Sequence, residues 1–182
     1  MRPTERLMEE HRAILRALDV LERIADRYGD APSAHAEDAR AVVGFIRGFA
    51  DELHHGKEEA MLFPAMEEVG HSLRAGPIGV MLTEHDEGRA LVRAMEGALD
   101  QAEGGADSFA AAAYSFAELL RAHIDKEDGI LFPLAERALP EKVRAALCVR
   151  FEEHDGARHA AAYRAHLDTL ARLEERLDAS AA

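Results

Sequence analysis

The feature that most constrains this chain is a motif of histidine, two residues, lysine and glutamate that occurs twice. The first copy is His54 to Glu58 and the second is His123 to Glu127, and a Leu-Phe-Pro tripeptide follows each copy. Residues four apart lie on one face of an α-helix, a turn from each other. Each copy therefore places an imidazole and a carboxylate side by side, and two such helices can supply the ligands of a two-metal site.

A second repeated feature precedes each copy of the motif, because Glu10-His11 lies upstream of the first and Glu84-His85 upstream of the second. The chain thus consists of two similar halves, each with a Glu-His helix followed by a His-x-x-x-Glu helix. Two halves related by a pseudo-twofold axis would place a symmetric site on the axis of a helix bundle. The predicted metal ligands are His11, His54, Glu58, His85, His123 and Glu127.

The composition predicts an all-α protein, because the chain has no Trp, few aromatic residues, and many Ala, Leu, Glu and Arg residues. Helical periodicity, Gly, Pro and capping residues place helices at about 4–28, 34–61, 78–102, 107–131 and 141–177. We expect one domain over residues 1–182, an up-down-up-down four-helix bundle with its core at about 4–139. The additional C-terminal helix would pack outside the bundle or over one end.

Three residues are expected to interrupt these helices. Pro64 and Pro133 lack a backbone N–H, so we expect a kink or break at the end of the second and fourth helices. Gly156 is the expected weak point of the fifth helix.

The charge and the single cysteine exclude several classes of function. A net charge of −13 argues against binding nucleic acid or an anionic membrane surface. Cys148, the only cysteine, excludes an internal disulfide framework and a multi-cysteine zinc or iron–sulfur site. No apolar run is long enough to span a membrane, and the N-terminus opens into a charged helix rather than a signal peptide. We expect a cytoplasmic protein without nucleic-acid or membrane partners.

The donor set of four imidazoles and two carboxylates favours iron. Zinc prefers four ligands, often with cysteine, and magnesium and calcium seldom take four imidazoles, whereas manganese accepts these ligand types. If Glu58 and Glu127 both bridge, each metal receives four protein bonds, and an octahedral ion keeps about two further positions. An open position is what a ligand-binding or redox site requires.

The sequence gives weaker reasons to regard the remaining histidines as metal ligands. His55 lies about a quarter turn from His54, so it should miss the site or stand behind the ligands. His154, in a Glu-His-Asp sequence on the fifth helix, is a possible additional ligand, and so is His159. An ordinary polar role for His154 is the favoured interpretation, because the four-helix ligand set is complete without it.

Other residues beside the motif have structural interpretations. Phe63 and Phe132 should be core residues that keep the site dry. Lys57 and Lys126, each directly before the motif glutamate, should point away or offset nearby acidic side chains.

This pattern resembles the hemerythrin-like HHE cation-binding domain over about residues 4–139. The resemblance implies a non-haem centre of two iron ions with oxo- or hydroxo-type bridging in a four-helix bundle. Respiratory hemerythrins have a His-x-x-x-His pair on the third helix and an aspartate on the fourth. Here Arg89 stands four residues after His85, and the fourth helix carries Glu127, so the chain is similar to the symmetric branch with two bridging glutamates.

That branch includes di-iron proteins of iron–sulfur cluster repair, the iron- and oxygen-sensing domain of a ubiquitin-ligase subunit, and bacterial stand-alone proteins. The repair proteins carry an extra N-terminal domain with cysteines that has no equivalent in this sequence. These departures argue against reversible oxygen storage and against cluster repair through such a domain.

The sequence therefore predicts a di-iron protein that binds or reacts with a small diatomic or peroxide, namely oxygen, nitric oxide or hydrogen peroxide. Any catalysis would be redox chemistry on peroxide or nitric oxide. A second hypothesis is a sensor or iron-binding module without turnover. A third is a structural bundle in which the histidines and glutamates only pair with one another. Spacing does not choose among the three small molecules, and protein partners stay undefined.

Overall fold

The computed structural model describes residues 2–101 and 104–179. Every regular element in these two ranges is helical, which confirms the all-α prediction. The elements in chain order are α1 (Pro3–Asp30), α2 (Pro32–Phe45), η1 (Ile46–His55), η2 (Glu58–Leu62), α3 (Phe63–Glu68), α4 (Gly76–Leu99), α5 (Gly105–Lys126), η3 (Glu127–Leu131), α6 (Phe132–Ala138), α7 (Glu141–Glu153), η4 (His154–Arg158) and α8 (Ala160–Ala179), where η marks π-helical segments.

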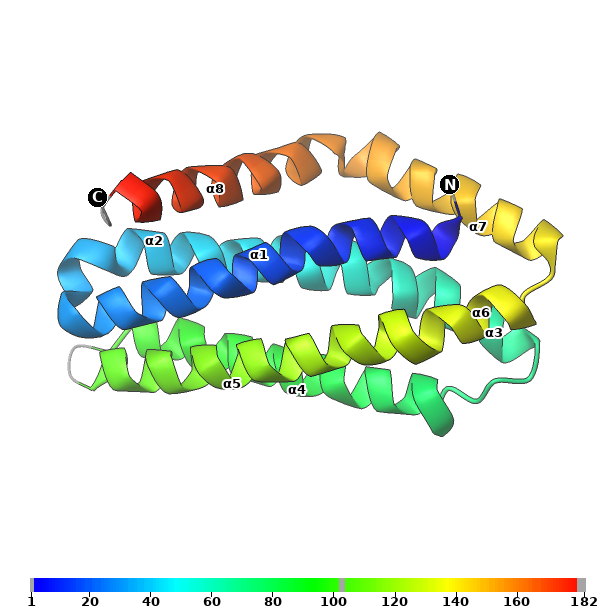
Figure 1. Ribbon diagram of the computed structural model, residues 1–182, viewed down its shortest axis with the longest axis horizontal. Helices are drawn as coiled ribbons and strands as arrows, with labels where there is room; N and C mark the ends of the chain where they lie inside the picture. Colours follow the sequence, from blue (N-terminus) through cyan, green and yellow to red (C-terminus); the bar gives the residue numbers. More distant parts are fainter. Residues whose placement is uncertain (1, 102–103, 180–182) are drawn as a thin grey trace.

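The elements from α1 to α6 form four long helices, because α2 to α3 are continuous and so are α5 to α6. Consecutive long helices run in opposite directions, as Figure 1 shows. α1 packs against α2 and α5, and α4 packs against the same two helices, which closes the bundle. The predicted up-down-up-down bundle is confirmed. The predicted end of the third helix at residue 102 lies outside the described residues.

Of the expected kink or break at each proline, the break was wrong, because the second and fourth helices continue to Glu68 and Ala138. A π-helical turn precedes each proline, and the N–H of Phe63 donates to the carbonyl five residues earlier, that of Glu58. Pro64 then lies in the first turn of an α-helical segment, where its missing N–H is tolerated. Both π turns begin at the motif glutamates, and such turns are frequent at functional sites.

The predicted fifth helix is two helices. α7 and α8 meet at an angle beside η4, which contains Gly156, and the backbone leaves the helical conformation at His159 with φ −122° and ψ −3°. α7 packs on α1 and η2, whereas α8 packs on α1 and α2. The bend lets the C-terminal helices follow the outer face of the bundle (Figure 1).

The apolar core consists of two clusters that lie at different positions along the bundle. The larger cluster includes Leu21, Phe45 and Phe109, and the smaller includes Leu62, Phe63 and Phe132. Within the described ranges, no helix is long and apolar enough to cross a membrane.

Candidate metal centre

All six predicted ligand residues meet in one buried polar layer inside the bundle. None of the six is more than 1% exposed. They come from α1, η1, η2, α4, α5 and η3, and they are His11, His54, Glu58, His85, His123 and Glu127. The smaller apolar cluster borders this layer, because Phe132 stacks on His11 and Phe63 stacks on His85, with ring centroids 5.5 and 6.0 Å apart.

The four histidines form two pairs that face each other through their Nε2 atoms. His11 and His54, the first pair, have Nε2 atoms 3.0 Å apart. His85 and His123, the second pair, have Nε2 atoms 3.2 Å apart. Lone pairs at this distance repel unless a proton or a cation lies between them. Each pair therefore has the arrangement that two imidazoles take around one cation.

The two glutamates connect the pairs. Glu58 places Oε1 3.6 Å from Nε2 of His54 and Oε2 3.6 Å from Nε2 of His85, so one oxygen faces each pair. Glu127 places Oε2 3.2 Å from Nε2 of His11 and 3.4 Å from Nε2 of His123. A carboxylate that reaches both pairs could bridge two metals through its oxygens.

The carboxylates of Glu58 and Glu127 differ in their electrostatic environment. All four of their oxygens are buried and accept no hydrogen bond from outside the ligand set. Burial raises the pKa of Glu127, but His123 and His11 outweigh it and hold that pKa well below its usual range. Burial, together with the neighbouring carboxylate of Glu127, raises the pKa of Glu58 well above its usual range. Burying two such groups without compensation costs several kcal/mol, on the order of 1–3 kcal/mol for each group. Cations between the histidine pairs would remove this cost.

Each of the four histidines is oriented by a hydrogen bond from Nδ1 to a carboxylate outside the ligand set. The contacts are His11 to Asp128 at 2.8 Å, His54 to Glu10 at 2.9 Å, His85 to Glu59 at 2.6 Å, and His123 to Glu84 at 2.9 Å. With the proton held on Nδ1, a neutral imidazole presents its Nε2 lone pair to the centre. Carboxylates in this position are typical of metal-binding histidines.

Sequence reasoning missed the role of these four acids, although the signal was present. Glu10 and Glu84 directly precede a ligand histidine, and Glu59 and Asp128 directly follow a motif glutamate. Each acid holds a histidine on a different helix, so the repeat in the sequence is also a repeat in space.

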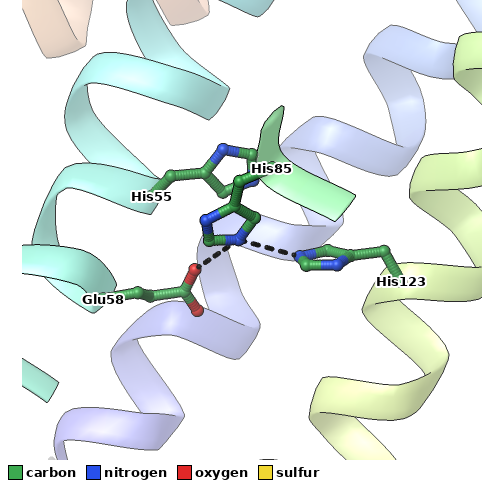
Figure 2. A group of neighbouring side chains, drawn as sticks. All are labelled: His55, Glu58, His85 and His123. Atoms are coloured by element: carbon green, nitrogen blue, oxygen red, sulfur yellow. Dashed lines mark hydrogen bonds and ion pairs between the residues drawn. The ribbon is translucent and has the colours of Figure 1, made fainter. Parts of the chain in front are cut away.

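His55 lies closer to the centre than a quarter-turn offset predicts. Its ring stacks on that of His85 with centroids 3.8 Å apart, and it is 6% exposed. Figure 2 shows it beside Glu58, His85 and His123, and one ligand atom from each of these four residues falls within 4.8 Å of the others. His55 is the last residue of the π-helical segment η1.

His154 and His159 face each other near the bend between α7 and α8, with ring centroids 4.5 Å apart. In the part of the chain that the structure describes, neither belongs to the two buried clusters of metal-binding side chains. Those clusters are His11, His54, Glu58 and Glu127, and His55, Glu58, His85 and His123.

A cavity of about 150 Å³ between η1, α4 and α5 reaches this centre. Its lining includes the buried rings of His55 and His85 and neither histidine of the first pair. Apolar side chains such as Val92 and Phe116 form part of its wall. Arg47 and Glu96, two residues that also line it, form an ion pair at 3.2 Å.

The comparisons with known proteins agree with this site. The model of the Hemerythrin HHE cation-binding domain matches residues 2–135, so α7 and α8 lie outside the match. The iron–sulfur cluster repair protein DnrN of Neisseria gonorrhoeae is 38% identical over 107 residues, which cover 54% of this chain and 68% of DnrN. The iron–sulfur cluster repair protein YtfE of Enterobacter sp. strain 638 is 33% identical over 112 residues, 56% of this chain and 51% of YtfE.

No solved structure matches the chain significantly. The chain spans about two thirds of DnrN and half of YtfE. The family match nevertheless covers most of the chain and contains both histidine pairs, both glutamates and all four orienting acids. The chain belongs to the Hemerythrin HHE cation-binding domain family.

Proposed function

We propose that this protein holds a non-haem centre of two iron ions. The first pair of histidines would bind one iron, the second pair the other, and the two glutamates would bridge them. The observation that carries this proposal is that the two ring nitrogens of each histidine have different partners. All four Nε2 atoms converge on two buried carboxylates, whereas each of the four Nδ1 atoms bonds to an acid outside the ligand set.

Iron is proposed because the centre combines imidazoles with carboxylates and contains no sulfur ligand. When bound, iron supplies a redox-active ion with a coordination position left for a small molecule. We propose that this molecule is oxygen, nitric oxide or hydrogen peroxide. The cavity beside His85 would admit it, because apolar walls accept small molecules of low charge. Phe63 and Phe132 close the other side against water.

Anaerobic loading with Fe(II), followed by metal analysis and an optical spectrum in air, tests this proposal. We expect about two irons per chain and near-ultraviolet charge-transfer bands. His54→Ala should lose at least half of the iron, because it removes one ligand of the first pair. His71→Ala, in the segment between α3 and α4, is the matched control and should bind as much iron as the unaltered chain.

A folded protein without iron, or one that takes up only manganese, would contradict the di-iron proposal. Adding nitric oxide or peroxide to the loaded protein then identifies the ligand by the spectrum that changes.

The names of the two relatives favour a second candidate, a part in iron–sulfur cluster repair. Bound iron whose spectrum responds to none of the three small molecules would favour that second function.

Metal affinity should depend steeply on pH because of His11. Burial lowers the pKa of His11, but Asp128 and Glu127 outweigh it and raise the pKa to about 9. Below that pH the ring carries an extra proton, which a metal must displace, so affinity should rise as pH increases towards 9. Release of one proton changes the affinity by about tenfold per pH unit. Competition titrations with Co(II) between pH 6 and 9 measure this, and a flat profile would contradict it.

A further inference from the structure

Lys57 is the most unusual side chain near the centre, because it is charged and fully buried. Its Nζ donates to Oε1 of Glu10 at 2.5 Å and to Oδ1 of Asp155 at 2.7 Å. Burying an ammonium group is costly unless it is paired with excellent geometry. The sequence prediction that Lys57 offsets nearby acids is therefore confirmed, but one of these acids comes from η4, in the C-terminal region.

This lysine is one of four charged groups that form a closed ring. Arg6 contacts Asp155 at 3.1 Å and Glu10 at 3.5 Å, so two cations face two anions. The other oxygen of Glu10 accepts from Nδ1 of His54 at 2.9 Å. The ring therefore fixes the carboxylate that orients a histidine of the first pair.

The second half of the molecule repeats the inner lysine contact, and there Arg89 also contacts Glu59, the acid that orients His85, at 2.8 Å. Lys126 contacts Glu84, which orients His123, just as Lys57 contacts Glu10. The Lys126 side chain is 36% exposed, and among the described residues Glu84 is the one acid that it contacts. Asp155 has no equivalent there. Both pairs thus have charged support, but among the described residues only that of the first pair includes a fully buried lysine and an acid from the C-terminal segment.

The surroundings of the two pairs differ in a second, independent way. The cavity between η1, α4 and α5 touches His85 of the second pair and neither histidine of the first. The C-terminal helices cover the side of the first pair, because α8 packs on α1 and α2 and α7 packs on α1. This packing is close: a Cβ atom added to Gly48 in η1 would lie 2.4 Å from the ring of His166 in α8.

We propose that the C-terminal helices make the two metal positions inequivalent. Asp155 and Lys57 are positioning residues that hold Glu10 against His54, so the first pair retains its metal while the second pair exchanges it. This inference rests on the proposed two-metal centre. It assigns a role to helices that lie beyond the family match.

Release of Fe(II) from the loaded full-length protein to a chelator, followed anaerobically, tests the inference. We expect two phases of about equal amplitude, one fast and one slow. His54→Ala should remove the slow phase. Asp155→Asn should accelerate the slow phase by about tenfold, the lower end of the range in metal affinity for groups behind a ligand, and leave the fast phase unchanged. Asp155→Glu should restore much of the slow phase.

Lys126→Met is the matched control, because it alters the corresponding contact in the other half. It should leave the slow phase unchanged. Arg6→Gln, at a half-buried residue, is the second variant if Asp155→Asn does not fold, and it should shift the slow phase in the same direction. A single phase in the unaltered protein, or equal acceleration of both phases by Asp155→Asn, would overturn the inference. Absence of bound iron would instead overturn the proposed function on which it rests.

Discussion

Replacing Glu58 with methionine is expected to abolish most iron binding and, at the same time, to stabilise the metal-free protein. Glu58 faces both histidine pairs, so its loss removes a ligand from each metal. Without metal, both of its oxygens are buried and undonated, and methionine of similar length removes that cost. We expect the free energy of unfolding of the metal-free protein to rise by about 1–3 kcal/mol.

Chemical denaturation of the metal-free variant, together with metal analysis after loading, measures both effects. Glu68→Met, at an exposed position at the end of α3, is the matched control and should change neither quantity. A lower iron content together with a higher free energy of unfolding would contradict a bundle in which Glu58 only pairs with histidines. A metal-free variant that is less stable than the unaltered chain would support that structural hypothesis and contradict the metal centre.

Removing iron from the unaltered protein should cause the largest loss of stability. A ligand that binds only the folded state stabilises it by about 4 kcal/mol when its concentration is a thousand times Kd, and there are two such sites in our proposal. Thermal unfolding with and without a chelator should therefore show a large fall in Tm. Equal Tm values in both conditions would contradict the proposal.

The loss should also be local. The polar layer separates the larger apolar cluster from the smaller one, and Phe63 and Phe132 of the smaller cluster stack on ligand histidines. Without metal, facing histidines and undonated carboxylates should loosen this end of the bundle first. Hydrogen exchange should therefore accelerate in η2, η3, α3 and α6, while the middle of α1 stays protected. A metal-free chain that unfolds throughout would instead favour the sensor hypothesis, in which iron occupancy controls the fold.

The sequence by itself determined the helical architecture and the composition of the buried layer. His54 and Glu58 are four residues apart, and this local spacing places both on one helix face whatever the rest of the chain does. Repetition of the spacing at His123 and Glu127 indicated a shared site. The break expected at Pro64 does not occur, because a π turn before this proline lets the helix continue.

Only the tertiary structure decided what stands behind the ligands. Glu10 orients His54 across two helices, and Asp155 reaches Lys57 from a C-terminal segment, so neither contact follows from spacing along one helix. Such contacts depend on how far each helix is rotated and shifted against its neighbours, and the packing of the two apolar clusters sets that rotation. The sequence thus specified which groups could bind metal, while packing between distant segments placed a cavity beside His85 and the C-terminal helices against α1 and α2.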